Sequence, residues 1–126
     1  MNEKKIKVAL IGNPNSGKST LFNALTGLNQ KVANFPGVTV EKHVGSFTVR
    51  DSFLAVDYKI ELTDLPGTYS LYPKTLDEQI PYRVLTDPTD ESFPDRIVVI
   101  ADATNLKRSL FLCSQIIDLK VPVVLV

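Results

Sequence analysis

The strongest chemical signal in the chain is a glycine-rich stretch that ends in lysine and serine. Residues 12–19 have the sequence GNPNSGKS and match the pattern G-x-x-x-x-G-K-[ST]. They follow the apolar run 5–11 and precede the helical pattern of 18–28, which is the setting in which such a loop binds phosphate. Glycines let backbone N–H groups turn toward an anion, and the first turn of the following helix adds partial positive charge. The stretch predicts a nucleotide-phosphate cradle, in which Lys18 reaches the β- and γ-phosphates and Ser19 ligates Mg²⁺.

Two later stretches could complete such a site. Residues 64–67, with the sequence DLPG, follow an expected strand, so that Asp64 could meet the metal through water and the N–H of Gly67 could face the γ-phosphate. Thr39, within PGVTVE, could add a hydroxyl ligand to Mg²⁺ when the γ-phosphate is present. Alone, D-x-P-G indicates an ordinary turn and Thr39 an ordinary loop residue. The three motifs in this order favour the nucleotide site.

The remaining candidates have simpler interpretations. His43 has no second histidine or cysteine at ligand spacing and is expected to be solvated. Cys113 lies on an apolar stripe and is expected in the core. The acidic stretch 87–95 predicts a solvated loop, and the pair Lys107-Arg108 is too small to indicate a nucleic-acid surface.

The hydrophobic pattern predicts strands that alternate with helices. Strands are expected at 5–11, 44–50, 56–63, 96–101 and 121–126, and helices at 18–28, about 75–85 and 106–119. The apolar faces of the first and last helices are expected to consist of Leu21, Phe22, Leu25 and Leu28, and of Leu106, Leu110, Cys113 and Ile117. Thr75 and Glu78 resemble a capping box, and Pro81 predicts a kink in the helix that they open. Residues 29–43 lack a clear period and predict a mobile loop. This alternation indicates an α/β fold with a mostly parallel sheet.

Length and composition exclude several classes of protein. With 126 residues, the chain has room for one domain. Its 14 basic and 14 acidic residues give no overall field that would attract nucleic acid, and one cysteine cannot form an internal disulfide. No apolar run approaches the length of a membrane helix, so we expect a soluble piece. Because residues 121–126 end inside an apolar strand, we expect a cut domain with an exposed apolar edge that favours association.

The motifs GNPNSGKS, NFPGVTVEK and DLPG, in this order, resemble the N-terminal G domain of the ferrous iron transport protein B (FeoB) family. The similarity spans essentially the whole chain, and NFPGVTVE is its most specific part. The resemblance implies a P-loop NTPase fold of the Ras-like type, in three α/β/α layers. It implies that residues 1–126 are a single GTP-binding G domain that lacks its last strand and helix. The guanine-reading motif N-[KM]-x-D would follow VPVVLV, so guanine selectivity rests on the resemblance alone.

The resemblance also assigns roles to individual residues. Asn15 matches an asparagine that is a K⁺ ligand in K⁺-activated relatives, with a turn-capping role as the alternative. Lys18, Thr39, Gly67 and Asn15 are expected to support hydrolysis, and Ser19, Thr39 and Asp64 to hold Mg²⁺. The residues expected around GTP or GDP and its ions are Gly12, Asn13, Pro14, Asn15, Ser16, Gly17, Lys18, Ser19, Thr20, Pro36, Gly37, Val38, Thr39, Asp64, Leu65, Pro66 and Gly67. Thr68 follows D-x-x-G, where Ras-like enzymes place a water-orienting glutamine, which predicts slow turnover with water positioned by backbone groups.

The implied function is a slow GTPase switch for Fe²⁺ uptake, at the cytoplasmic face of the bacterial inner membrane. The implied partners lie outside this chain: the membrane domain of the transporter, a following cytosolic helical domain and small Feo-system proteins, with self-association left open and no nucleic acid. One alternative is a soluble P-loop GTPase of ribosome assembly or tRNA modification, which would carry a different sequence around Thr39. Another is a noncatalytic interaction fragment that binds no nucleotide.

Overall fold

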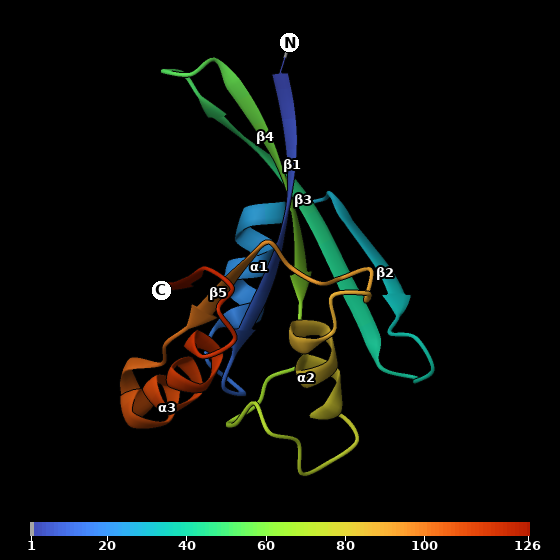
Figure 1. The fold of residues 1–126 in the computed structure, drawn as a ribbon, viewed down its shortest axis with the longest axis vertical. Coiled ribbons are helices and arrows are strands. Elements are labelled where there is room, and N and C mark those ends of the chain that lie inside the picture. Colours follow the sequence, from blue (N-terminus) through green and yellow to red (C-terminus); the bar gives the residue numbers. More distant parts are fainter. Residues whose placement is uncertain (1) are drawn as a thin grey trace.

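The computed structural model describes residues 2–126 as a six-stranded sheet with helices on both faces (Figure 1). The strands lie in the order β2-β3-β4-β1-β5-β6. Strand β3 is antiparallel to both its neighbours, whereas β4, β1, β5 and β6 are parallel to one another. The strand bounds are β1 Asn2–Gly12, β2 Gln30–Asn34, β3 Glu41–Asp51, β4 Val56–Asp64, β5 Arg96–Ile100 and β6 Val123–Leu125. This arrangement confirms the predicted α/β class.

Strand β1 lies at the centre because its sequence can be buried on both faces. Ala9, Leu10 and Ile11 have no exposed surface. Leu10 packs on one face with Phe22 of α1 (Lys18–Thr26), while Ala9 and Ile11 pack on the other. Burial of such side chains contributes about 1.5–3 kcal/mol each. The strand thereby fixes the position of Gly12, where the phosphate-loop motif begins.

Helices cover the two faces unequally. Helix α1 covers one face, where Phe22 packs with Val8, Leu10, Leu62 and Ile100. Helices α2 (Gln79–Thr86) and α3 (Leu106–Ile117, preceded by the short 3-10 helix η1, Ala103–Asn105) cover the other. The larger core there consists of Ala9, Ile11, Phe35, Leu65, Leu71, Ile80, Val84, Leu85, Ile97, Val99, Leu112, Cys113 and Ile116. The predicted three layers are therefore present.

The buried helix faces differ from those predicted. In α1, Phe22 and Thr26 face the sheet, whereas Leu25 is 42% exposed and Leu28 lies beyond the end of the helix at Gly27. In α3, the buried face consists of Ser109, Leu112, Cys113 and Ile116, while Leu106, Leu110 and Ile117 are exposed. Of the predicted α3 stripe, only Cys113 is buried. This helix has two apolar stripes, and the sheet, not periodicity, selects which one is covered.

The prediction of a mobile loop at 29–43 is wrong over most of its length. Residues 30–34 form the edge strand β2, which pairs antiparallel with the start of β3, from Gln30 opposite Gly45 to Asn34 opposite Glu41. Most side chains of β2 are exposed, so this strand has no apolar alternation to reveal it. The hydrogen bonds to β3, and not an apolar pattern of its own, hold residues 30–34 in a strand.

Helix α2 begins later than predicted. The hydroxyl of Thr75 accepts a bond from the N–H of Glu78 at 3.3 Å, which is one half of a capping box. The Glu78 carboxylate accepts from the Thr75 hydroxyl at 3.2 Å, whereas a full capping box would have it accept from the backbone N–H of Thr75. Regular helix starts only at Gln79, which places Pro81 in the first turn. A proline there removes no intrahelical hydrogen bond, so no kink is needed.

The acidic stretch 87–95 is a loop, as predicted, in which Glu91 and Asp95 are exposed, and it is also attached to the sheet. Two hydrogen bonds join Lys7 and Asp95: the N–H of Lys7 donates to the side-chain Oδ2 of Asp95 at 2.9 Å, and the N–H of Asp95 donates to the carbonyl of Lys7 at 2.7 Å. Lys42 Nζ forms an ion pair with Glu91 at 3.0 Å, and Lys7 Nζ donates to the carbonyl of Glu91 at 2.8 Å. Two strands therefore hold this segment.

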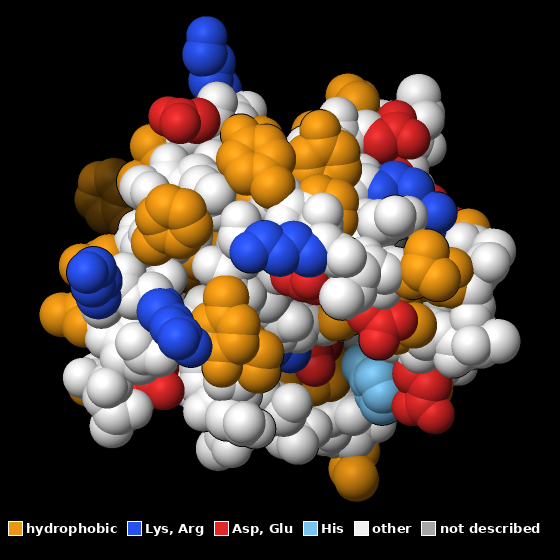
Figure 2. Space-filling model, turned by 90° about the horizontal axis from the view of Figure 1, so that it is seen from below, with side chains coloured by type: hydrophobic (Ala, Val, Ile, Leu, Met, Phe, Trp, Pro, Cys, Tyr) orange, Lys and Arg blue, Asp and Glu red, His pale blue; other side chains and the backbone are white. Residues whose placement is uncertain are grey.

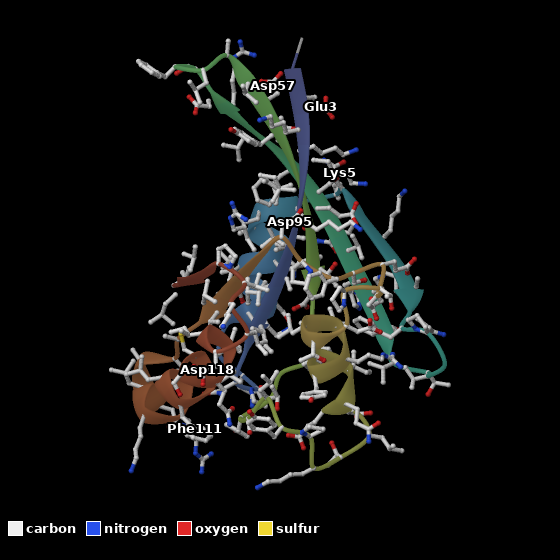
Figure 3. The ribbon with its side chains drawn as sticks, in the orientation of Figure 1. Glu3, Lys5, Asp57, Asp95, Phe111 and Asp118 are labelled. Carbon is white, nitrogen blue, oxygen red and sulfur yellow. The ribbon has the colours of Figure 1, made fainter. Side chains whose placement is uncertain are left out.

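The end of the sheet away from α2 and α3 is exposed and carries charged side chains, among them Glu3, Lys5 and Asp57 (Figure 3). Glu3 and Asp57 lie opposite each other there, on β1 and β4. Exposed ion pairs join Lys5 to Glu61 and Arg50 to Asp57, both at 2.9 Å. Such exposed pairs contribute little to stability. Among residues 2–126, no helix has the length and apolarity required to cross a bilayer.

Candidate nucleotide-binding site

The phosphate-loop motif forms a tight backbone turn between β1 and α1. Asn15 and Gly17 have positive φ values of 62° and 86°. Such angles are routine for glycine and tolerated by asparagine, and they turn successive N–H groups toward one side. Gly17 is the N-cap of α1 and makes no side-chain cap bond, so no side chain satisfies the first N–H groups of the helix. The loop is therefore shaped to receive an anion.

A pocket of about 530 Å³ lies over this turn. Its lining consists of Asn13, Pro14, Asn15, Ser16, Gly17, Lys18, Ser19, Thr20 and Gly67. The hydroxyl of Ser16 is buried without a hydrogen-bond partner among the described residues. This hydroxyl is buried close to Gly12, so a phosphate in the pocket would not reach it without a movement of the side chain. The turned backbone and the side chains of Lys18 and Ser19 in the lining fit a phosphate group.

Lys18 and Asp64 form an ion pair in this pocket. Lys18 lies at the start of α1 and Asp64 at the end of β4, and their side chains are only 11% and 14% exposed. The lysine predicted for phosphate and the aspartate predicted for Mg²⁺ are thus brought together. In this structure each one neutralises the other.

The segment 64–70, called switch II below, is packed onto the phosphate loop. A Cβ added at Gly67 would lie 3.0 Å from both N and Cα of Pro14, so only glycine fits without a shift. The N–H of Thr68 donates to the carbonyl of Gly12 at 3.0 Å, and the N–H of Leu65 donates to that of Leu10. The two motifs, which are far apart in sequence, therefore meet as predicted.

The hydroxyl of Thr68 is engaged within switch II and α2. Thr68 is 2% exposed, and its Oγ1 donates to the carbonyl of Ser70 at 2.6 Å and lies 3.1 Å from Glu78 Oε2. A hydroxyl held in this way has no free proton with which to orient water. This geometry agrees with the prediction that Thr68 does not replace the missing glutamine.

Three polar residues near the site were not predicted to position switch II. The side chain of Asn13 donates to the carbonyl of Thr68 at 3.0 Å and accepts from Ser109 of α3 at 3.2 Å. Gln115 of α3 accepts from the hydroxyl of Ser70 and the N–H of Leu71. No sequence pattern links α3 to these segments, because the contacts depend on the helix packing beside them.

The loop 35–40, called switch I below, does not line the pocket. Phe35 is 1% exposed and packs in the core beneath α2, and Arg83 donates to the carbonyl of Pro36 at 3.1 Å. Thr39 is exposed. The structure therefore brings Lys18, Ser19, Asp64 and Gly67 close together but not Pro36, Gly37, Val38 and Thr39. The predicted roles of these four residues stay predictions.

Other metal-binding or reactive groups are few. Within residues 2–126, no three His, Cys, Asp or Glu side chains form a group that could hold a metal. His43 Nε2 lies 3.0 Å from Glu41 Oε2 on the surface of β3. Cys113 is buried, which confirms its placement in the core, and this burial raises the pKa of its thiol.

The end of the molecule that carries α2 and the switches has a mixed surface (Figure 2). Apolar side chains alternate there with basic and acidic ones. Tyr69 of switch II and, further along the chain, Tyr72 and Leu76 are exposed. The guanidinium of Arg108 lies 4.8 Å from the centre of the Tyr69 ring. A smaller pocket of about 360 Å³ lies between switch I and α2, lined by Val38, Pro73, Leu76, Gln79, Ile80, Tyr82 and Arg83.

Comparison with known families decides what this pocket belongs to. The model of the family described as "Ferrous iron transport protein B" matches residues 6–126. The chain belongs to the FeoB family. The Fe(2+) transporter FeoB of Escherichia coli (strain K12) is 44% identical over 123 residues, which cover 94% of this chain and 15% of the transporter. The chain thus spans about one seventh of the length of that FeoB relative.

Solved FeoB structures share the fold. The G domain of the T. maritima FeoB iron transporter has a TM-score of 0.83 and 44% identity, covering 98% of this chain and 70% of that one. The cytosolic domain of L. pneumophila FeoB has a TM-score of 0.81 and 48% identity, covering 94% and 43%. The T. maritima cytosolic domain has been solved in apo, GDP and GMPPNP forms. This FeoB-family chain therefore has the fold of a P-loop G domain, as predicted, and the soluble-GTPase alternative is not favoured.

Proposed function

We propose that this FeoB-family G domain binds GTP and GDP, hydrolyses GTP slowly and acts as a switch for Fe²⁺ uptake. The main observation is the pocket that the phosphate loop and Gly67 form together. A glycine held against the phosphate loop is suited to detect whether a third phosphate is present. The GDP and GMPPNP forms of the related T. maritima domain support a nucleotide as the ligand.

Phosphate binding in this proposal rests on the backbone and one lysine. The backbone N–H groups of residues 15–20 surround the phosphates, and Lys18 leaves Asp64 to contact the β- and γ-phosphates. A lysine or backbone donor to a charged oxygen contributes about 1.5–3 kcal/mol. The apolar core under Gly12 keeps the loop rigid, so little ordering is required on binding.

Metal ions would complete the site. Ser19 and Asp64 lie next to the pocket and are the residues that would hold Mg²⁺, with Thr39 joining when switch I moves. Bound Mg²⁺ would neutralise charge on the phosphates, and K⁺ at Asn15 would add to this effect. The φ of 62° at Asn15 turns its backbone as an asparagine allows, which is consistent with either the ligand or the turn-capping role.

Slow hydrolysis follows from the residues that surround the attacking water. No glutamine follows D-x-x-G, and the hydroxyl of Thr68 is held by Ser70 and Glu78. Backbone groups of switch I and switch II are left to position the water. Hydrolysis removes the γ-phosphate contacts of Gly67 and Thr39 and releases both loops.

The transport role belongs to the whole protein. The printed name of the relatives is Fe(2+) transporter FeoB, and the chain spans 15% of their length. We propose that nucleotide state in this domain controls iron passage through a membrane domain outside this chain, on the cytoplasmic side. A following helical domain, small Feo-system proteins and a second copy are the proposed further partners.

The test uses purified full-length protein with GTP and Mg²⁺, in K⁺ and in Na⁺. We expect GDP binding in both salts and phosphate release that is faster in K⁺. Asn15→Ala should remove the K⁺ stimulation and leave GDP affinity nearly unchanged. Absence of GDP and GTP binding by the unchanged protein would refute the proposed function. An equal K⁺ response in both proteins would remove only Asn15 from it.

A further inference from the structure

Ser109 is a polar residue on the buried face of α3. It has no exposed surface, and its neighbours on that face are Leu112, Cys113 and Ile116. Its hydroxyl accepts from the N–H of Asp102 at 2.9 Å and donates to Oδ1 of Asn13 at 3.2 Å. A serine in an apolar face is costly unless its hydroxyl is bonded, and this one is bonded in both directions.

Asn13 continues the chain of hydrogen bonds into switch II. This side chain is 2% exposed, and its Nδ2 donates to the carbonyl of Thr68 at 3.0 Å. Because Ser109 donates to Oδ1, the amide must present its NH₂ group to Thr68. Ser109 thus fixes which way the Asn13 amide is turned, although the two residues are 96 positions apart.

The hydrogen bond from Asn13 reaches switch II directly beside Gly67. The carbonyl of Thr68 is held by Asn13, and its N–H is held by the carbonyl of Gly12. Gly67 itself lies against Pro14, with no room for a Cβ. Both sides of Thr68 are therefore attached to the phosphate loop, and the backbone of Gly67 has little freedom.

We infer that Ser109 is a positioning residue that acts through Asn13 to hold the Gly67 backbone where it meets the γ-phosphate. The inference rests on the proposed function and deepens it. GDP contacts the phosphate loop and needs no contact with Gly67, whereas a nucleotide with a γ-phosphate does. The relay from Ser109 through Asn13 to Thr68 therefore sets the preference for triphosphate over diphosphate.

The experiment measures the affinities of GDP and GMPPNP, with Mg²⁺, by titration calorimetry on purified full-length protein. Ser109→Ala and Asn13→Ala should each weaken GMPPNP binding about three- to tenfold, the effect of one neutral hydrogen bond. GDP affinity should change less than twofold in Ser109→Ala, and in Asn13→Ala, which alters the phosphate loop itself, it should fall by a smaller factor than GMPPNP affinity. The double variant should bind GMPPNP no more weakly than Asn13→Ala alone, because both changes break one relay.

Ser114→Ala is the matched control. Ser114 lies on the same helix, is exposed, and donates only to the carbonyl of Phe111 in its own turn. Ser114→Ala removes the same serine hydroxyl but breaks no contact to switch II, so the affinities for GDP and GMPPNP should both be unchanged. Ser109→Cys, which keeps a weak donor at the buried position, should lie between Ser109→Ala and the unchanged protein, and it replaces Ser109→Ala if that variant does not fold.

The outcomes separate the relay from the function on which it rests. If the unchanged protein binds neither nucleotide, the proposed function and the relay are both overturned. If GDP and GMPPNP affinities fall together in Ser109→Ala and Asn13→Ala, the residues merely support the fold and the relay alone is wrong. Tighter GMPPNP binding in these variants would mean that the contacts restrain switch II away from the γ-phosphate, which also overturns the inference.

Discussion

Lys18 pairs with Asp64 in this structure and is proposed to contact the phosphates when a nucleotide binds. Its substitution tests whether the contact with phosphate contributes to nucleotide affinity. Lys18→Ala should weaken GDP and GTP binding about 10- to 100-fold, because one charge-assisted contact to phosphate is lost. The measurement is equilibrium titration with GDP and Mg²⁺. Lys74→Ala is the control, since Lys74 is an exposed lysine outside the pocket. Unchanged affinity in Lys18→Ala would contradict the phosphate cradle.

Thr68 provides the test of how water is positioned. Thr68→Ala removes the hydroxyl that donates to the carbonyl of Ser70. We expect a loss of about 1 kcal/mol in the free energy of unfolding, because a buried hydrogen bond is lost. GTP hydrolysis should persist at a rate within about tenfold of the unchanged protein, because the hydroxyl contributes no more than one hydrogen bond. Loss of all phosphate release in single-turnover assays would show that Thr68 takes a direct part.

At the level of secondary structure, the contact between α1 and β3 depends on one glycine. A Cβ added at Gly45 would lie 2.2 Å from Cγ2 of Thr26, a distance that real Cβ atoms essentially never show. Gly45→Ala should therefore lower the free energy of unfolding by about 1–3 kcal/mol or more, as overpacking does. Urea unfolding measures the change. Ser46→Ala at the next position should have a much smaller effect, and equal midpoints for the two variants would contradict the packing described.

The same elements show what could be predicted from the sequence. The buried strands β1 and β5 were predicted because a strand covered on both faces is a continuous apolar run. The phosphate loop was predicted because its glycines and lysine lie at fixed spacing between a strand and a helix. Each of these patterns lies within one short stretch of sequence, so it can be recognised without knowledge of the fold.

The features that were missed depend on contacts between distant segments. Strand β2 is ordered by pairing with β3 and not by its own residues, most of which are exposed. The buried stripe of α3 includes Ser109, which looks like a surface residue in the sequence. Its role is visible only once Asn13 and Thr68 lie beside it. Switch I was predicted from its motif, but its position away from the pocket follows from the burial of Phe35.

At the scale of the whole molecule, the acidic loop is attached to the sheet through Glu91. The hydrogen bond from Lys42, together with its charge, lowers the pKa of Glu91 below its ordinary value of 4.5. A lowered pKa means that the contact stabilises the fold fully above about pH 4.5, and that this contribution is lost as the pH falls through the lowered value.

Glu91→Gln should therefore reduce stability at pH 7 and have a smaller effect near pH 3. The check compares urea midpoints of the two proteins at both pH values. Glu41→Gln provides a matched control for the loss of a surface carboxylate, because Glu41 pairs with His43 and not with the acidic loop. A difference between Glu91→Gln and the unchanged protein that stays constant with pH would contradict the attachment through Lys42.

The ion pair between Lys18 and Asp64 has a consequence for how the site fills. A nucleotide alone would take Lys18 but leave the Asp64 carboxylate facing the phosphates, and Mg²⁺ alone would take Asp64 but leave a lysine facing a divalent cation. Each ligand removes the charge that opposes the other, so each should raise the affinity for the other by the same factor. The Lys18–Asp64 ion pair thus favours binding of the metal and the nucleotide together over binding of either one alone.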